Sequence, residues 1–461
     1  MKTAIDWISH WEKWNVRSVG IKRGNTFFEI YPWVKVKLLH KWIMNTENHQ
    51  VRGGKLLWNQ VQSLFFGWTA LFKRYDYWII SNYLERVYKD GKWWDKLFDP
   101  ITDQLGQSKT CFIELQFFVK YRRRDVYSQN IISKAWWMLP EEFISGILRL
   151  FPKKIDGQEY LSRMMKDLNV EVNVESIVTK NYAQYVWMKF LLRILRPPKV
   201  VFLSVSYSNF GYIRAFKESG IRVVEVQHGL IGSSHFSYTY NTDFDNIQFP
   251  DDFLVFGNND VQSLKRMRFP VTNIFPIGKS VILPLYNRVG AITGRVRSVS
   301  VALQDGEFSF QLLRFVICCA STWGKSIRWV IQNRRISRSE IERAMQFPEN
   351  VIWSETDMYE CIVNCDAHLT IYSTTSIEAL SIGRVVLLYN YDQLSDYHLG
   401  KSLMGQKGVY FVNESEDLRL VLQQLNDIDK EELAISNQNN IAFDYHDHLK
   451  KYLNEYLEID Q

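Results

Sequence analysis

The chain alternates continuous apolar runs with amphipathic stretches, most regularly in its middle. KVVFLSVSY at 199–207 and IRVVEVQ at 221–227 have the unbroken apolar character of buried parallel strands, and residues 211–220 between them have a helical pattern that ends at Gly220. Two buried strands joined by one short helix predict a parallel sheet with a right-handed crossover. The stretch 251–278 repeats the pattern as DDFLVFG, NNDVQSLKRM and VTNIFPIG, which predicts a doubly wound α/β domain.

A second alternation of strands and helices begins near residue 298. Residues 287–298, NRVGAITGRVRS, are polar, glycine-containing and basic, so we expect an inter-domain linker there. A chain of 461 residues is long enough for two cores, and we predict domains at 1–285 and 286–461, the second ending in helices. The runs that predict strands of the second domain are VSVAL, QLLRFVICCAS, IRWVIQ, ENVIWS, AHLTIYS, VVLLYN and GVYFV.

The first half of the chain is less regular. Residues 159–195 have a continuous helical pattern that Pro197 and Pro198 end. Aromatic residues make up 15% of the chain, with 16 Trp, and many lie in the first 150 positions beside Lys and Arg. This composition indicates either a thick aromatic core or a surface that meets lipid or sugar.

Composition and charge narrow the class of protein. The five cysteines form neither a CxxC pair nor a His/Cys ligand spacing, so we expect a reducing compartment without disulfides or zinc. Asp6, Glu12 and Lys13 interrupt the N-terminus where a signal peptide needs an apolar core, and no run approaches the ~18 uncharged apolar residues of a membrane span. We therefore expect a cytoplasmic protein. The net charge of +6 is too small to indicate nucleic acid.

Basic residues concentrate between Arg288 and Arg338, where nine Lys or Arg stand against two acids. Such a stretch either faces a phosphate-bearing donor or an anionic membrane surface, or is a solvated helix face.

The first candidate chemistry directly follows the predicted strand IRVVEV. Gln227, His228 and Gly229 lie at the edge where open parallel sheets bind ligands. A histidine there accepts a proton from an acceptor hydroxyl or, when charged, binds a phosphate. Gly229 permits a sharp turn or the close approach of a ligand. His235 and Tyr238 complete the predicted acceptor side. The alternative is a structural histidine that caps a turn.

The second candidate is the segment HLTIYSTTSIEALSIG, where a buried strand runs into a hydroxyl-rich turn and a helix. Free backbone N–H groups and the positive end of the helix dipole favour an anion, so a diphosphate would fit there. Glu378, in the first turn, either accepts a hydrogen bond from a ribose hydroxyl or caps its own helix. The predicted donor-binding hydroxyl residues are Ser373, Thr374, Thr375 and Ser376.

No Asp-x-Asp pair lies in a strand-end loop. Asp243 and Asp245 have that spacing, but they stand in the polar segment NTDFDNIQFP before a strand. We therefore expect neither a metal-bridged diphosphate nor another cofactor, because helix N-termini and basic side chains can replace the cation.

The combination of VVEVQHGLI, PDDFLVFG, FPIGKS and STTSIEALSIGRVVLLYN resembles the GT-B glycosyltransferases that build capsules and other bacterial surface polysaccharides, over roughly residues 80–410. The segment ERVYKDGKWWDKLFDPITDQL, with Arg86, Lys92, Asp95 and Asp99, also resembles an N-terminal block of such proteins. The resemblance implies two Rossmann-like doubly wound domains facing across a cleft, with the acceptor on the N-terminal side and the donor nucleotide on the C-terminal side.

The resemblance also assigns roles to residues. It implies that His228 is the catalytic or acceptor-orienting group, that the hydroxyl turn and Glu378 hold the donor, and that Gly278 ends the last N-terminal strand beside the cleft. Related sialic acid and Kdo transferases often carry a His-Pro pair where this chain reads IRWVIQNRRISR. The missing pair argues against a cytidine monophosphate sugar, and Arg334 and Arg335 can supply phosphate contacts in its stead.

We therefore predict a metal-independent glycosyltransferase that moves a sugar from a nucleotide-activated donor to a glycan or lipid-linked glycan of a capsule or O-antigen, in peripheral contact with the inner membrane surface. Two enzyme alternatives on similar scaffolds are a polyol-phosphate transferase of teichoic-acid type and a sugar-nucleotide epimerase. A further alternative is a non-catalytic scaffold of a polysaccharide assembly complex, which the basic, aromatic N-terminal segment would suit.

Overall fold

The computed structural model describes nine stretches of the chain. These are residues 3–44, 53–82, 85–115, 122–151, 154–232, 234–304, 307–323, 326–333 and 338–457.

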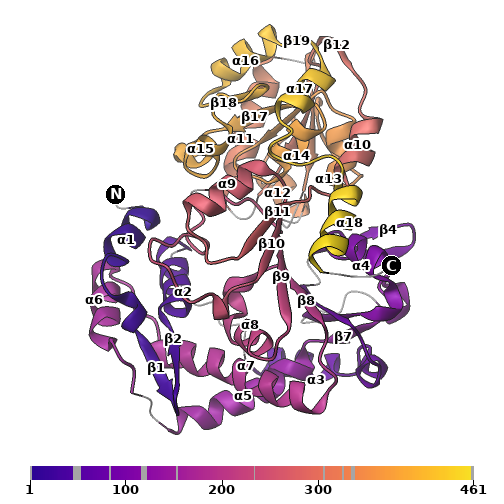
Figure 1. Cartoon of the computed structure of the whole chain (residues 1–461). Helices are drawn as coiled ribbons and strands as arrows, with labels where there is room; N and C mark the ends of the chain where they lie inside the picture. The colour runs from indigo at the N-terminus through magenta and orange to yellow at the C-terminus, as the bar shows by residue number, and fades with distance from the viewer. Residues whose placement is uncertain are drawn as a thin grey trace. The chain divides into compact units, whose positions relative to one another are not determined.

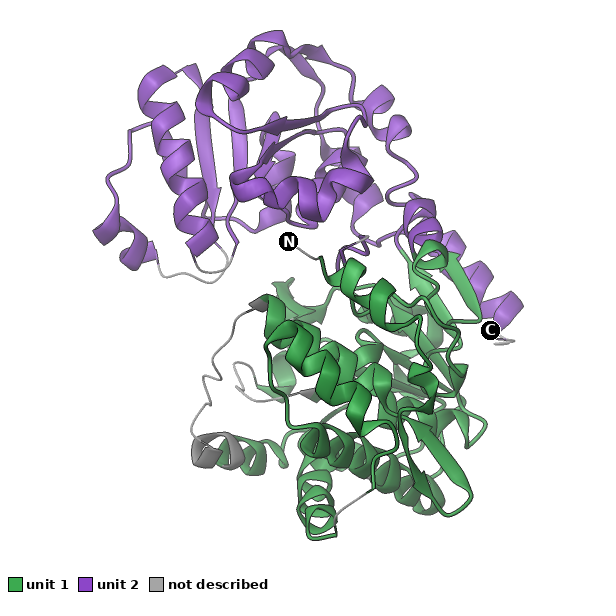
Figure 2. Cartoon of the chain, turned by 90° about the vertical axis from the view of Figure 1, so that its left-hand side faces the viewer, with its two compact units in different colours: residues 1–228, 235–255, 264–275 green, residues 229–234, 256–263, 276–461 purple. Residues whose placement is uncertain are grey.

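Two compact units make up this part of the chain, and each is built on its own parallel sheet (Figures 1 and 2). Both are Rossmann-like, doubly wound α/β structures, as the strand and helix alternation predicts. The predicted domain boundary after residue 285 stays a prediction. Unit 1 comprises residues 1–228, 235–255 and 264–275, and unit 2 comprises residues 229–234, 256–263 and 276–461.

The sheet of unit 1 has seven strands in the order β11-β10-β9-β8-β3-β6-β7. β3 (Tyr77–Asn82) pairs in parallel with β6 (Thr110–Leu115) on one side and with β8 (Val200–Leu203) on the other. Along the chain, β6 and β7 are added on one side of β3, and β8, β9, β10 and β11 are then added on its other side. The direction of winding therefore reverses between β3 and β8. This reversal is the switch point of a doubly wound sheet.

The remaining strands of this sheet and the elements that surround it complete unit 1. They include α1 (Ala4–Trp11), β1 (Gly20–Arg23), β2 (Thr26–Glu29), α2 (Tyr31–Met44), α3 (Gly53–Ser63), β4 (Arg86–Lys89), β5 (Lys92–Asp95), α4 (Asp99–Leu105), β7 (Ile131–Ser133), α5 (Ala135–Arg149), α6 (Gln158–Leu168), α7 (Val174–Ile194), α8 (Phe210–Lys217), β9 (Arg222–Val226) and β10 (Asp252–Val255), while α9 (Asn258–Arg266) and β11 (Asn273–Pro276) contribute residues to both units.

The sheet of unit 2 has six strands, paired in parallel throughout, in the order β15-β14-β13-β16-β17-β18. Numbered from β13 (Ser298–Ala302), this is the order 3-2-1-4-5-6 of dinucleotide-binding Rossmann folds. The switch point therefore lies between β13 and β16 (Ala367–Thr370). Val385 and Leu387 of β17 pack on one face of the sheet, and Val386 and Leu388 pack in a second core cluster. Burial on both faces explains the continuous apolar runs.

The remaining elements of unit 2 are the other four strands of this sheet, the helices of the unit, and β12 and β19, which form a small sheet of their own. They are α10 (Ile282–Arg288), β12 (Ile292–Arg295), α11 (Glu307–Trp323), β14 (Arg328–Gln332), α12 (Arg338–Ala344), β15 (Val351–Trp353), α13 (Met358–Val363), α14 (Thr375–Ser381), β17 (Val385–Tyr389), α15 (Lys401–Leu403), β18 (Val409–Val412), α16 (Ser415–Gln424), β19 (Asn426–Ile428), α17 (Lys430–Ser436) and α18 (Tyr445–Tyr456).

The predicted strand QLLRFVICCAS is wrong, because this segment lies inside the helix α11. Leu312, Leu313, Val316 and Cys319 recur three or four residues apart and enter the core cluster on one face of the sheet. The helical period was present in the sequence, but the density of apolar residues concealed it.

The predicted linker at 287–298 is also wrong. Its first residues complete α10, and β12 pairs antiparallel with β19, with Ile292 opposite Ile428. The partner strand lies far along the chain, so local composition does not reveal it. The predicted helical stretch 159–195 is two helices, since Asn169 adopts a left-handed φ of 51° at the end of α6 and Asn173 caps α7.

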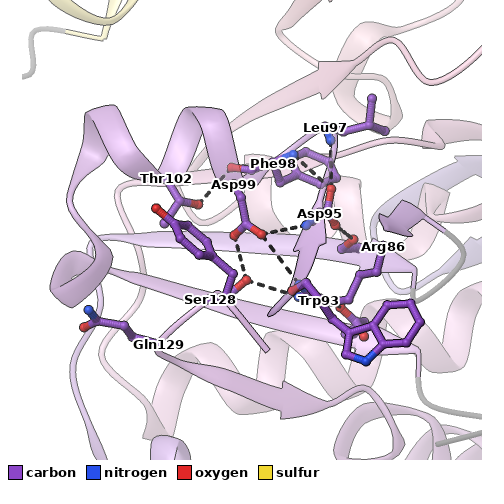
Figure 3. A network of polar contacts seen from close by, with 12 residues as sticks. Arg86, Trp93, Asp95, Leu97, Phe98, Asp99, Thr102, Ser128 and Gln129 are labelled. Carbon is purple, nitrogen blue, oxygen red and sulfur yellow. Dashed lines mark hydrogen bonds and ion pairs between the residues drawn. The ribbon is translucent and has the colours of Figure 1, made fainter. Parts of the chain in front are cut away.

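A buried ionic network joins the hairpin β4–β5 to the sheet of unit 1 (Figure 3). Arg86 donates from Nε to Glu114 Oε2 at 2.6 Å, and its Nη1 lies 3.6 Å from Asp99 Oδ2. Ser81, in β3, donates to Asp95 at 2.5 Å, and the Asp95 N–H donates to Asp99 at 2.6 Å. Burial and the charge of Asp95 raise the pKa of Asp99 to about 7, against the opposing charge of Arg86. Three buried carboxyl groups thus surround one guanidinium.

Replacing Arg86 by Met should lower the free energy of unfolding by about 3–5 kcal/mol, because it leaves buried carboxylates without their cation. Arg17, which is half exposed beside Glu29, is the control within the same unit, and Arg17→Met should change the value by less than about 1 kcal/mol. Urea unfolding followed by tryptophan fluorescence measures both variants. Equal effects would contradict the dependence on the buried guanidinium.

Candidate functional site

The switch point of unit 2 lies between Gln304, which follows β13, and Ser373, which follows β16. With the Gln304 amide turned so that its oxygen faces them, that oxygen accepts hydrogen bonds from the N–H groups of Tyr372 at 3.1 Å and Ser373 at 3.2 Å. These bonds join the two strand ends where open α/β sheets bind their ligands. The hydroxyl-rich turn 373–376 therefore begins at the switch point of the sheet.

The hydroxyl groups of this turn have different partners. Ser376 Oγ donates to Ser373 O at 2.7 Å, and Thr375 Oγ1 lies 2.8 Å from His368 Nε2. Ser373 Oγ accepts from the Thr375 N–H at 3.3 Å. Within the described stretches of the chain, Thr374 uses neither its hydroxyl nor its N–H in a hydrogen bond. Thr374 and the hydroxyl proton of Ser373 are thus the donors that this turn offers to a ligand.

His368, in β16, is fully buried and bridges two hydroxyl groups. Its Nδ1 lies 2.9 Å from Ser300 Oγ, and Ser300 donates its own proton to Ala367 O at 3.2 Å. Ser300 therefore accepts from Nδ1–H, and Nε2 accepts the proton of Thr375. Burial lowers the pKa of His368 to about 4, against the charge of Glu378, so the imidazole is neutral at neutral pH. The hydrogen bond from Thr375 to His368 therefore orients the Thr375 side chain and uses its hydroxyl proton.

Glu378, in α14, forms a buried ion pair with Lys279 and accepts a hydrogen bond from the Tyr359 hydroxyl at 3.3 Å. Gly278 has a φ of 86°, and a Cβ at this position would overlap the carbonyl oxygen of Ala442. Backbone packing by itself therefore explains the glycine, which places Lys279 beside the first turn of α14. Lys279 is a positioning residue that sequence reasoning did not single out, although it stands in the motif FPIGKS. The roles of Glu378 and Gly278 in donor binding stay predictions.

His228 is the second residue after β9, at the carboxyl edge of the sheet of unit 1. It is half-buried, and burial lowers its pKa below the ordinary value, while the charge of Glu85 and the backbone of Ser204 raise it. Ser204 follows β8, one of the two strands at the switch point. Gln227 is buried, and its N–H donates to Leu254 O at 2.9 Å. The structure thus places His228 at this edge, where its lowered pKa keeps the imidazole neutral near pH 7.

Tyr238 and His235 pack with ring centroids 4.5 Å apart. Tyr238 is buried, and its hydroxyl donates to Glu225 at 2.7 Å, while the Ser206 N–H donates to the same carboxyl oxygen at 3.1 Å. Burial raises the pKa of Glu225 to about 7, although these hydrogen bonds lower it. Tyr238 therefore anchors the loop to β9. Sequence reasoning missed Glu225, whose signal is the single acid in the apolar run VVEV.

The loop after His228 reaches the hydroxyl turn inside unit 2. Gly229 has no positive φ, and an added Cβ would meet nothing within 4 Å, so the fold does not require glycine there. Ser234 Oγ lies 3.4 Å from His398 Nδ1, and the His398 ring lies 4.3 Å from the ring of Tyr372, which precedes the turn. His398 is a third residue that sequence reasoning missed, because no motif surrounds it.

Two further features of the sequence are the basic pair Arg334 and Arg335 and the Asp-x-Asp spacing. Arg334 and Arg335 fall outside the described residues. Asp243 accepts from Arg268 at 2.6 Å, and Asp245 caps the short helix that follows it. Among the residues that the structure describes, no group of three or more His, Cys, Asp or Glu is arranged to hold a metal ion. The same stretches contain no helix that is both long and apolar enough to cross a membrane.

The fold and these edges define a doubly wound α/β protein with candidate polar residues at the carboxyl edge of each sheet. No protein-family model matches the chain, and no curated protein matches its sequence.

Several solved structures have a similar arrangement of elements. A UDP-GlcNAc 2-epimerase from Neisseria meningitidis, bound to UDP-GlcNAc, is 10% identical, with 83% of this chain and 100% of that chain covered and a TM-score of 0.46. CalG4, the calicheamicin glycosyltransferase, is 12% identical, with 83% and 99% covered and a TM-score of 0.48. The wall teichoic acid polymerase TagF is 11% identical, with 94% and 100% covered and a TM-score of 0.42. At these values no function is transferred from the neighbours to this chain.

The buried His368 should make stability depend on pH. Its imidazole titrates near pH 6.5 when unfolded and near 4 when folded, so between these values the unfolded chain binds the proton more tightly. Its contribution to stability is complete above pH 6.5 and is lost as the pH falls toward 4. His368→Gln does not titrate, so the unfolding free energy of the native protein minus that of the variant should fall by about 3 kcal/mol from pH 6.5 to 4. Urea unfolding at several pH values measures this difference. A difference that does not change with pH would show that His368 is not held neutral.

Proposed function

We propose that this protein transfers a sugar from a nucleotide-activated donor to a glycan acceptor. The observation that carries the proposal is the place of the hydroxyl turn 373–376, which begins at the switch point of a parallel sheet in the order 3-2-1-4-5-6. Ligands of open α/β sheets bind at such points, and nucleotide phosphates are frequent among them. The family resemblance of the sequence motifs supports the same class of reaction.

The donor phosphates are proposed to bind Thr374 and Ser373. Thr374 offers a hydroxyl and an N–H, and Ser373 offers a hydroxyl proton, which together suit the oxygens of a phosphate. Thr375 and Ser376 act as supports, because their protons are used inside the protein. Arg334 is proposed to add a cationic contact to the phosphates, without a bridging metal ion. The base and the sugar of the donor are left open.

His228 is proposed to act as the general base. As the acceptor oxygen forms its bond to the anomeric carbon and the bond to the leaving nucleoside phosphate breaks, the imidazole takes the proton of the acceptor hydroxyl. Its lowered pKa keeps it neutral at pH 7, as this role requires. Gln227, Gly229 and His235 are proposed to line the acceptor side, and Tyr238 to hold the loop through Glu225.

The acceptor is proposed to be a glycan or lipid-linked glycan of a bacterial surface polysaccharide such as a capsule or O-antigen. This part follows the motif resemblance. The proposed cytoplasmic location follows from the cysteine pattern and the charged N-terminus, and the proposed peripheral contact with the inner membrane surface follows from the basic and aromatic composition. Product analysis separates sugar transfer from transfer of a phosphorylated polyol and from inversion of a free nucleotide sugar.

A nucleoside diphosphate should raise the melting temperature of the native chain, and Thr374→Val should weaken its binding about tenfold to a hundredfold, because a hydrogen bond to a charged oxygen is lost. Thermal shift with uridine, cytidine, guanosine, adenosine and thymidine nucleotides identifies the base, and calorimetry gives the affinity. The control is Thr322→Val, the same change on the exposed side of α11, which should bind as the native chain does. If no nucleotide stabilises the native chain at millimolar concentration, the non-catalytic scaffold becomes the better hypothesis.

His228→Ala should lower the transfer rate about 10²- to 10⁴-fold while leaving nucleotide affinity unchanged, because it removes a base and not a phosphate contact. The native rate should fall as the pH drops below 6.5 through the lowered pKa of His228, since the protonated imidazole cannot accept a proton. The exposed His448 is the control, and His448→Gln should keep the native rate and pH profile. An unchanged rate in His228→Ala would remove His228 from the mechanism.

A further inference from the structure

The helix α5 of unit 1 buries Ala135 and Trp137 in its first turn, but farther along it buries polar side chains and exposes apolar ones. Glu141 and Ser145 are buried, whereas the side chain of Phe143 is 71% exposed. Glu141 accepts a hydrogen bond from the buried Tyr212, and Lys134 supplies a nearby positive charge. A water-facing helix normally has the opposite distribution. The outward side of α5 therefore has a composition suited to a less polar environment than water.

The exposed apolar positions of α5 follow one stripe. Trp136, Phe143, Ile147 and Leu150 are spaced three to seven residues apart, which places them on one side of a helix, and Phe151 continues the stripe. Leu150 is 76% exposed and Phe151 is 63% exposed. α5 packs along α7 within unit 1 (Figure 1), and the helical spacing places the stripe on the side of α5 away from the buried Glu141 and Ser145.

The end of α3 extends this surface. Trp136 Nε1 donates to Leu64 O at 2.9 Å, which holds the start of α5 against the residues after α3. Phe65 is 77% exposed there, and Trp68 is also exposed. We call the whole set the α5 face. It consists of Phe65, Trp68, Trp136, Phe143, Ile147, Leu150 and Phe151.

The α5 face gathers more exposed apolar residues than other surfaces of the described chain. In unit 1, Phe190 and Ile194 form a smaller exposed pair on α7. In unit 2, Leu283, Ile352, Met404, Leu420 and Ile435 lie singly on different elements, which is ordinary for a protein surface. A contiguous exposed apolar surface instead marks a site of interaction.

Basic residues stand at both ends of the α5 face. Lys73 and Arg74 follow the turn that contains Trp68, and Arg149 and Lys154 stand at the end of α5, all of them exposed. The exposed acid of α5, Glu142, lies 3.7 Å from Lys180, which offsets its charge. Aromatic and aliphatic side chains between basic ones match a bilayer interface, where rings enter the headgroup layer and cations meet anionic phosphates.

We propose that the α5 face docks on the surface of a bilayer that contains anionic lipids. A second copy of the chain is the less suitable occupant, because a symmetric contact through this face would bring the basic residues of one copy toward those of the other. The docking proposal is argued from the exposed residues of the α5 face. It rests on the proposed function only for which membrane the face meets. Docking there would keep the enzyme beside a lipid-linked acceptor.

Co-sedimentation with vesicles tests the proposal. The native chain should bind vesicles of phosphatidylcholine with about one third phosphatidylglycerol, bind pure phosphatidylcholine more weakly, and lose affinity as salt rises. The double variant Phe143→Ser/Leu150→Ser should bind at least about tenfold more weakly, because two exposed side chains no longer enter the bilayer. Arg149→Glu/Lys154→Glu should lose the preference for phosphatidylglycerol. Leu420→Ser/Ile435→Ser, exposed residues of unit 2, should bind as the native chain does.

Two results would overturn the proposal. One is that the native chain fails to bind the anionic vesicles at physiological salt, or that Phe143→Ser/Leu150→Ser binds as well as the native chain. The other is a native dimer in sedimentation velocity that this variant converts to a monomer without any vesicle binding, which would make the face an interface between copies. Nucleotide stabilisation is measured on the same samples. If a nucleotide still stabilises the native chain and the variant while vesicle binding is absent, the docking proposal alone has failed and the transferase proposal stands.

Discussion

Parallel strand pairing with both faces covered is the constraint on which the rest of the structure depends. Crossover helices place an apolar layer on each side of such a sheet, so residues along a strand have no contact with water. Val385 to Leu388 illustrate this, since consecutive residues enter opposite core clusters. Polar chemistry is therefore confined to the carboxyl edge, where the chain leaves the sheet and turns. His228 and Ser373 each occupy such an edge.

Polar groups that are buried near these edges have matched partners. Gln304 satisfies two backbone N–H groups at the end of β16, and His368 lies between Ser300 and Thr375. Lys279 and Glu378 neutralise one another beside α14. Because an unpaired polar group in a core costs several kcal/mol, these contacts permit few alternatives to the observed geometry. The result is a turn whose backbone is held in place before a ligand arrives, so less entropy is lost when Ser373 and Thr374 bind one.

The α5 face has the opposite energetic character. Exposing Phe143 and Leu150 to water forgoes about 1.5–3 kcal/mol for each side chain that could have been buried, while Glu141 is taken out of water at further cost. Folding alone gives no reason for this distribution, because exchanging the two sides of the helix would favour the isolated unit. A surface that is unfavourable in water becomes favourable at an interface that accepts both rings and cations. The energy of Phe143 and Leu150 therefore depends on whether the α5 face meets water or such an interface.

The sequence by itself determined the strands that carry the two candidate sites and the positions where those strands end. The runs IRVVEVQ and AHLTIYS are apolar, rich in β-branched residues and followed at once by polar residues, so their identity as strands and the position of His228 and Ser373 after them were readable from local pattern. The doubly wound class followed from the alternation of such runs with helices. These features depend on neighbours in the chain, which is why local reasoning reached them.

Only the tertiary structure decided which of these residues are available to a ligand. His368 takes the proton of Thr375 because Ser300, on a neighbouring strand, fixes its tautomer, and Glu378 is paired with Lys279 from a distant segment. The assignment of QLLRFVICCAS to a helix and the pairing of β12 with β19 likewise depend on partners far along the chain. Hydrogen-bond direction, ion pairing and the choice of the outward side of α5 are properties of contacts between segments, and contacts between segments are absent from any local pattern.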